Sequence, residues 1–302
     1  RMELNLAPPL FSRNTGYEDE DAAISLSRSR PEAILTWSPS ARKKLKGDVY
    51  PAGKLVIACN GMCTVGIRRS LAETPDTKSG PKLQLLGSLV LPEAPILQVN
   101  VSDPMTAHPS CLLYALNASE DEAGSVTLAL IGTKMPTTGA FQFAEALMSR
   151  VESKSVVLLD TIQTQEAEGD VEQLKTLRRV TSTKCTLEEH EEKIKPLPPP
   201  FIVQGVAAAV LSYCEVHGKS AKLFCGFEDM HRTLDTCIAF EPLLSSKTLN
   251  ILSAEALGTT LMKKRAAYKS AAESIGFSCK FTPGPLSLSD PAFTTPPKGV
   301  YI

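Results

Sequence analysis

Six short apolar runs rich in strand-forming residues most limit what this chain can fold into. They cover residues 54–60, 86–91, 111–116, 125–132, 155–162 and 221–227. The first of them is continuous and stops at an Asn-Gly pair, as a strand buried on both faces does. A sheet made of such strands needs helices on both sides, because neither face can be left in water.

Helical patterns lie between the later runs. Residues 138–151 place Ala140, Ala144, Leu147 and Val151 on one stripe, and residues 203–218 do the same with Val206, Val210 and Cys214. Gly218 is a natural end for the second helix. A final helix is expected from Ser253 to Ile275, with Gly276 after it. This alternation predicts an α/β fold of three layers, with a largely parallel central sheet flanked by helices and with flexible N- and C-terminal tails.

The composition changes along the chain and predicts its division. Residues 1–48 show no sustained periodicity and are interpreted as a mobile N-terminal arm, in which the segment around Trp37 is a candidate for a short anchored element. Residues 49–278 form a single α/β domain, with a charged surface excursion at about 163–200 that ends in a proline segment. Residues 279–302 contain too many prolines for a helix or a central strand and are expected to be an extended tail.

The charge balance excludes two classes of partner. Thirty-two basic residues against thirty-three acidic ones give a formal net charge of -1. The charge of such a chain provides no net electrostatic attraction for a nucleic-acid backbone or an anionic membrane. No secretory h-region and no run long enough to span a bilayer is present in the sequence. We therefore expect a soluble cytoplasmic protein, with the nucleus open as a second location.

The eight cysteines predict neither disulfides nor a metal site. Most of them lie inside apolar runs, where a reduced thiol behaves as a small hydrophobic residue. Cys59 and Cys63 are four residues apart, but no second pair of cysteines or histidines stands near them at ligand spacing. We expect no metal ion and no cofactor.

Polar residues follow the predicted strands where an α/β enzyme would place its site. These residues are Asn60, Asp160, Glu228, Asp229 and His231. Two carboxylates and a histidine can act as acid, base and orienting group, although residues of this kind also cap helices and occupy loops. The GxSxG, GxxxxGK[ST] and GxGxxG signatures are absent from the sequence. We predict no catalytic residues and no enzyme activity, and keep an α/β hydrolase or phosphorylase-like enzyme as the alternative.

Residues 201–252 carry a more specific signal. They include "AAVLSYC" at 208–214 and "AFEPLLSSKTL" at 239–249, and the stretch resembles the proteasome assembly chaperone 1 family. That family ends in a hydrophobic-Tyr-any (HbYX) signature, and this chain ends in Val300, Tyr301 and Ile302. The resemblance assigns these three residues to a pocket of the proteasome α-ring.

The chemistry of the last residues suits docking. A terminal carboxylate is a compact anion that a lysine in a pocket can pair with, and only a true terminus carries it. Tyr301 offers a flat apolar ring with a hydroxyl group that needs a partner when buried. Val300 adds a small apolar contact.

The resemblance implies a chaperone for assembly of the 20S proteasome. Such a protein forms a heterodimer with proteasome assembly chaperone 2 and binds the α-ring, with its tail docked between α subunits. Its role is to promote correct ring assembly and to block premature ring pairing or cap binding. A further alternative is an activator of mature particles that uses the same tail.

Overall fold

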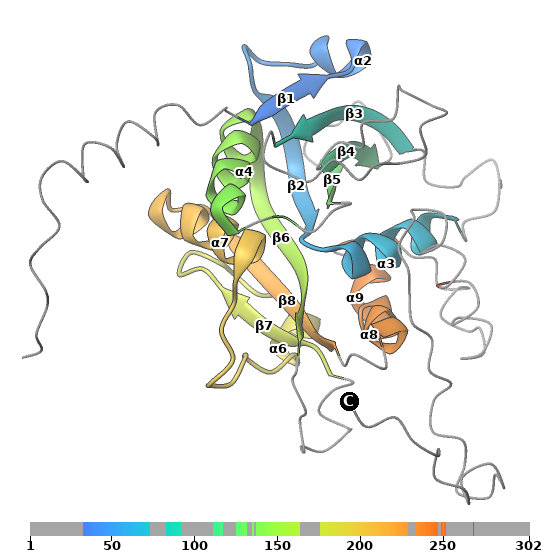
Figure 1. Ribbon diagram of the computed structural model, residues 1–302, viewed down its shortest axis with the longest axis vertical. Coiled ribbons are helices and arrows are strands. Elements are labelled where there is room, and N and C mark those ends of the chain that lie inside the picture. The colour runs from blue at the N-terminus through green and yellow to red at the C-terminus, as the bar shows by residue number, and fades with distance from the viewer. Residues whose placement is uncertain are drawn as a thin grey trace, which may run out of the picture. The chain divides into compact units, whose positions relative to one another are not determined.

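The computed structural model describes residues 33–72, 83–91, 111–116, 125–131, 137–163, 176–228 and 233–246, and the single residues Met135, Leu249, Ile251 and Tyr268. They belong to one compact unit that begins at Ala33. Figure 1 shows a twisted sheet with helices on both sides. No helix in this part of the chain is long and apolar enough to cross a membrane.

The central element is a sheet of eight strands. In chain order these are β1 (Ile34–Trp37), β2 (Tyr50–Ala58), β3 (Leu83–Val90), β4 (Cys111–Leu116), β5 (Val126–Ile131), β6 (Val151–Gln163), β7 (Arg178–Thr181) and β8 (Ala221–Glu228). Their order across the sheet is β1-β3-β4-β5-β2-β6-β8-β7. All six predicted strands are confirmed, and β1 and β7 are additional.

The direction of the strands differs in part from the prediction. The central strands β5, β2, β6 and β8 pair in parallel. The edges do not, because β1, β3, β4 and β5 form an antiparallel series and β7 pairs antiparallel with β8. The sheet is therefore mixed rather than largely parallel. Periodicity along one strand indicates its burial but not the direction of its neighbour.

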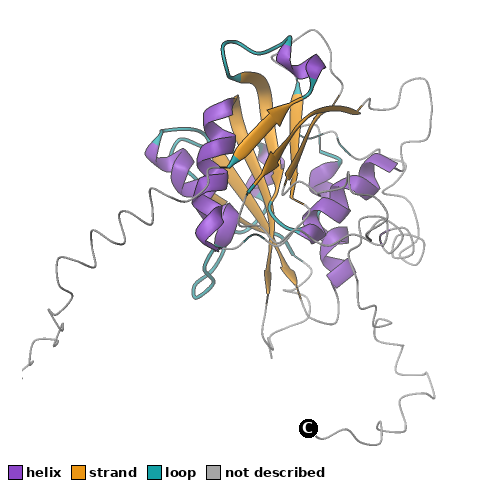
Figure 2. Cartoon of the chain, turned by 45° about the horizontal axis from the view of Figure 1, so that its top comes forward, coloured by secondary structure: helices purple, strands orange, loops and turns teal. Residues whose placement is uncertain are grey.

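Helices cover both faces of the sheet, which confirms the three-layer α/β prediction (Figure 2). On one face lie α4 (Thr137–Arg150) and α7 (Gly205–Val216), which contact each other. On the other face lie α3 (Gly61–Ala72), α8 (Thr233–Ala239) and α9 (Glu241–Leu244). Two further single-turn helices are α2 (Pro39–Arg42) and α6 (Glu189–Glu192). The predicted stripes on α4 and α7 are buried, and Gly218 has a φ of 61° just after α7.

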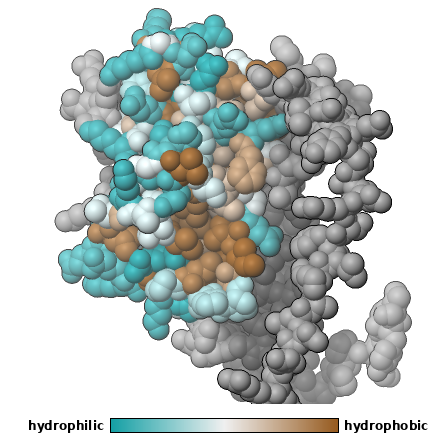
Figure 3. All heavy atoms as spheres, turned by 90° about the vertical axis from the view of Figure 1, so that its left-hand side faces the viewer, coloured by the Kyte–Doolittle hydropathy of each residue, from teal (hydrophilic) through white to brown (hydrophobic). Residues whose placement is uncertain are grey.

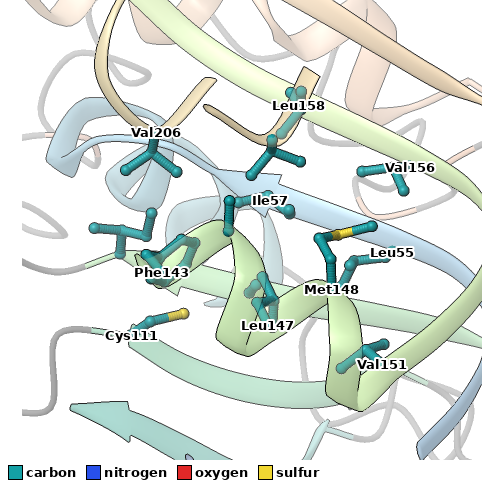
Figure 4. Packing of buried hydrophobic residues seen from close by; sticks show 14 of the residues in the cluster. Leu55, Ile57, Cys111, Phe143, Leu147, Met148, Val151, Val156, Leu158 and Val206 are labelled. Carbon is teal, nitrogen blue, oxygen red and sulfur yellow. The ribbon is translucent and has the colours of Figure 1, made fainter. Parts of the chain in front are cut away.

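The core divides into two apolar layers, one on each face of the sheet. In β2, Leu55 and Ile57 contribute to the layer under α4 and α7, and Val56 and Ala58 to the layer under α3 and α9. Figure 4 shows the first layer, in which Phe143 and other α4 residues pack against the sheet. Successive residues of a strand point to opposite faces, so a continuous apolar run supplies both layers at once.

In the structure the folded domain begins at residue 33, not at residue 49 as predicted. Residues 33–48 belonged to the predicted N-terminal arm, but they form β1 and α2 and join the sheet. The ring of Trp37 stacks on Tyr50 with 5.6 Å between ring centroids. Ser38 begins α2, where its side chain accepts a hydrogen bond from the Ala41 amide. The short anchored element that was a candidate around Trp37 is therefore present, and it consists of β1 and α2.

The predicted surface excursion at 163–200 is also corrected for its second half. Residues 178–181 are the edge strand β7, and residues 189–192 form α6 beside it. Arg178, Ser182 and Glu191 are buried. A charged composition does not by itself show exposure, because charged side chains can be buried when they have partners.

Several predictions lie outside the described residues. These are the arm up to residue 32, the first part of the excursion, the final helix apart from Tyr268, and the tail at 279–302. Tyr268 itself is helical and fully buried, and its hydroxyl donates to Glu241 Oε1 at 3.0 Å.

Candidate functional site

Four polar side chains meet at the carboxyl ends of the parallel strands. Asn60 follows β2, Asp160 and Thr161 lie near the end of β6, and Glu228 is the last residue of β8. Because the ends of parallel strands meet at one edge, the sheet brings together residues that are far apart in the chain. The expected meeting of Asn60, Asp160 and Glu228 is confirmed. Asp229 and His231 lie outside the described residues.

A continuous series of hydrogen bonds connects these groups. Asn60 Nδ2 donates to Asp160 Oδ1 and to Thr161 Oγ1, both at 2.7 Å. Thr161 Oγ1 then donates to Glu228 Oε2 at 2.8 Å, and the Thr161 amide donates to Asp160 Oδ1 at 2.8 Å. Asn60 Oδ1 accepts from the Cys63 amide at 2.9 Å and so caps the first turn of α3. Thr161 was missed by sequence reasoning, because a threonine inside an apolar run gives no separate signal.

The environment of the cluster favours protonated carboxyl groups. Burial raises the pKa of Asp160 from 3.8 to about 7, and the negative charge of Glu228 adds to this rise. The bonds from the Thr161 amide and from Asn60 oppose it. Burial also raises the pKa of Glu228, while the hydrogen bond from Thr161 lowers it. The cluster therefore holds two acids that give up their protons less readily than acids in water.

The neighbouring thiols are poor nucleophiles. Cys59 and Cys63 are buried, and this burial, with the charge of Asp160 as the next cause, raises the pKa of both thiols well above the ordinary value. A thiol reacts as the thiolate, which is scarce under these conditions. Within the described residues no group of three or more His, Cys, Asp and Glu side chains is arranged to hold a metal ion. The chemistry shown is that of a hydrogen-bonded network that joins β2, β6, β8 and α3.

Replacing Asp160 by asparagine should raise stability at pH 8 by about 1–2 kcal/mol. Between pH 3.8 and about 7 the folded protein keeps a proton that the unfolded chain has released, so stability falls as the pH rises through this window. Asparagine keeps an oxygen acceptor for Asn60 and the Thr161 amide and removes the titration. Urea denaturation at pH 5 and pH 8 measures the effect, with Asp48→Asn on the exposed surface as the control. If the stability of the Asp160 variant fell with pH as steeply as that of the parent chain, the raised pKa of Asp160 would be contradicted.

A buried ion pair lies elsewhere, between β8 and α6. Lys222 Nζ is 2.5 Å and 2.7 Å from the two carboxylate oxygens of Glu191, and both side chains are almost fully buried. Glu191 also accepts from the Glu188 amide at 2.9 Å, which completes a capping box at the start of α6. Sequence reasoning missed this pair because its members are 31 residues apart.

The three residues assigned to α-ring binding, Val300, Tyr301 and Ile302, lie outside the described residues. Their assignment stays a prediction.

The comparison with protein families decides the family of the chain. A family model described as proteasome assembly chaperone 4 matches residues 12–275. The chain belongs to the proteasome assembly chaperone family. The resemblance seen in residues 201–252 is thereby confirmed, and it extends over the strands and helices upstream of that stretch.

Curated relatives agree with this assignment. Proteasome assembly chaperone 1 of Xenopus laevis is 28% identical over 249 residues, which cover 78% of this chain and 81% of the relative. The chaperone 1 of Danio rerio is 29% identical over 160 residues, which cover 51% of this chain and 56% of the relative. The family members that this chain matches are thus named as chaperones rather than as enzymes.

Solved structures share the fold at lower identity. PbaB of Pyrococcus furiosus, described as an archaeal proteasome activator, is 12% identical with a TM-score of 0.50, over 81% of this chain and 98% of PbaB. A protein of unknown function from Thermoplasma acidophilum gives a TM-score of 0.53 at 14% identity, over 80% of this chain and 93% of that chain. At these identities the likeness concerns the fold alone.

Proposed function

We propose that this chain is a chaperone for assembly of the 20S proteasome. It forms a heterodimer with proteasome assembly chaperone 2 and binds the α-ring. Its hydrophobic-Tyr-any tail docks between α subunits. In this position it promotes correct ring assembly and blocks premature ring pairing or cap binding.

The observation that carries the proposal is the family match over residues 12–275. Family membership supports a role in proteasome assembly, and the curated relatives of the chain carry the same name over most of its length. A binding role of this kind requires no cofactor and no catalysis. The proposed place of action is the cytoplasm, with the nucleus as a second location.

The ending of the chain supports a docking tail. Val300, Tyr301 and Ile302 supply an apolar contact, an aromatic ring and a terminal carboxylate, which together suit a basic pocket with an apolar wall. The twenty-one residues from 282 to 302 span at most about 70 Å when extended. A domain bound to the ring would raise the local concentration of such a tail at its pocket, so a contact of three residues can matter.

The surface over α4 and α7 supports a protein partner. Three large apolar side chains are exposed there: Phe141 at 64% in α4, Val216 at 81% in α7, and Ile202 at 71% just before α7. Figure 3 shows hydrophobic residues gathered on the side of the molecule that carries these helices. Exposed apolar groups that lie together on a surface are typical of an interaction site.

The test is recovery of α-ring assembly intermediates from cells with the full chain and with a version that ends at Gly299. We expect the truncated chain to recover at least tenfold less of the α subunits, because it lacks the aromatic ring and the carboxylate in its proper place. Adding one glycine after Ile302 should reduce recovery similarly, since it displaces the carboxylate. Mass spectrometry measures the composition of each sample.

Thr294→Ala with Thr295→Ala is the matched control, because it alters the same tail outside the last three residues. This control should bind like the full chain, and circular dichroism should show the same fold in all versions. Equal recovery by the truncated chain would remove the tail from the proposal. Absence of any proteasome subunit with the full chain would overturn the proposal itself. Stimulated peptide hydrolysis by mature particles would favour an activator instead.

A further inference from the structure

A basic cavity lies between β7 with the segment that follows α6 and the pair α8 and α9. Its volume is about 560 Å³. Four of the residues that line it are basic: Arg178, His190, Lys193 and Lys195. None of the described residues that line it is acidic. The described lining is therefore basic, on a chain whose net charge is close to zero.

Arg178 is a buried residue of this cavity whose Nε has no hydrogen-bond partner among the described residues. The residue is only 9% exposed. The adjacent Arg179 is satisfied, because its Nε donates to the Ile194 carbonyl at 2.6 Å. A buried charged donor left unpaired is costly, so such a group usually binds water, an ion or a ligand.

His190 also lines the cavity. Its Nε2 is also buried and has no partner among the described residues, while its Nδ1 lies 3.8 Å from Glu188 Oε2. Glu191 is bound to Lys222, and the other two glutamates of α6, Glu189 and Glu192, do not line the cavity. Glu188 does not line the cavity, but it is close enough to pair with His190, so the positive charge of the lining rests on Arg178, Lys193 and Lys195.

Apart from Thr176, the rest of the described lining is apolar. Leu177 and Ile194 are partly buried beside Arg178 and Lys195, and Leu243 of α9 is 2% exposed. A lone phosphate would pair with the cations and leave this apolar part uncovered. A nucleic acid would need basic groups spread along its backbone, which a single cavity does not offer. The volume suits one or two side chains with their backbone.

We propose that this cavity binds an acidic peptide segment of a partner protein. Carboxylates of the segment pair with Arg178, Lys193 and Lys195, and an apolar side chain between them covers Leu177 and Leu243. Arginine suits this role because its planar group can hold one carboxylate through two hydrogen bonds. The proposed site uses other residues than Val300, Tyr301 and Ile302, and the proposal does not depend on α-ring docking.

The test uses the full chain and a fluorescein-labelled pentapeptide with one leucine between two pairs of glutamates, with binding measured by fluorescence anisotropy. Lys193→Glu with Lys195→Glu should weaken binding at least tenfold, because two attractions become repulsions. Both lysines are exposed, so the fold should be kept. Lys43→Glu with Lys44→Glu, on exposed residues just after α2, makes the same change in net charge and should alter binding less than twofold.

Three further probes separate the contribution of the peptide's carboxylates from that of its leucine. A peptide with glutamine in place of each glutamate should lose binding, and a peptide with serine in place of leucine should bind several-fold more weakly. Inorganic phosphate should displace the peptide only weakly. No binding by the full chain, equal loss in both lysine pairs, or equal binding of the serine peptide would each overturn the proposal.

Discussion

Replacing Glu191 by alanine is expected to lower the free energy of unfolding by about 3–5 kcal/mol. The change leaves the Lys222 ammonium, whose side chain is 6% exposed, without its counter-ion. It also removes the acceptor for the Glu188 amide at the start of α6. Lys54 adds to the effect, because burial and the charge of Lys222 already lower its pKa while Glu191 raises it. Urea denaturation followed by circular dichroism measures the loss.

Two controls test the cause. Replacing both partners, with Glu191→Leu and Lys222→Met, should recover most of the stability, because no charge is then left buried. Asp48→Ala breaks the exposed pair between Asp48 and Arg150, whose atoms are 3.3 Å apart, and should change stability by less than about 1 kcal/mol. If Glu191→Ala were as mild as Asp48→Ala, the pair would be solvated rather than buried.

Replacing Gly87 by alanine is expected to lower the free energy of unfolding by about 2–3 kcal/mol. Gly87 lies opposite Trp37 in the pairing of β3 with β1, next to an irregularity in the register of β3 and β4. A Cβ atom at this position would overlap the backbone carbonyl oxygen of Thr36 and come within 3.2 Å of the Trp37 ring. A backbone atom cannot rotate away as a side chain can, so β1 itself must move.

The fluorescence of Trp37 reports this movement directly, because it is the sole tryptophan of the chain. The Gly87 variant should show a more solvent-exposed emission before global unfolding begins. Gly66→Ala in α3 is the matched control: outside its own helix, no atom of the described residues lies within 4 Å of its added Cβ, and alanine favours a helix by about 0.5–1 kcal/mol. The control should therefore be slightly stabilised. A Gly87 variant that unfolds like the parent chain would show that β1 tolerates the added atom.

The meeting of Asn60, Asp160 and Glu228 was predictable from sequence because it depends on one rule. Each residue lies at or near the end of an apolar run, and the ends of parallel strands lie at one edge. The role of Thr161 was not predictable, since the two hydrogen bonds of its side chain depend on which strands are neighbours. The basic cavity was also hidden, because its residues come from β7, from the segment around α6 and from α8 and α9.

The sequence by itself determined the elements that are continuous in the chain: six strands, the buried stripes of α4 and α7, and the family resemblance in residues 201–252. The strands and stripes follow from local periodicity, and the resemblance follows from motifs that are continuous in the sequence. Only the tertiary structure decided the rest: the antiparallel edges, the addition of β1 and β7, and the pairing of Lys222 with Glu191. The physical reason is that a short or charged segment is stabilised by partners far away in the chain, which cannot be identified from the segment's own sequence.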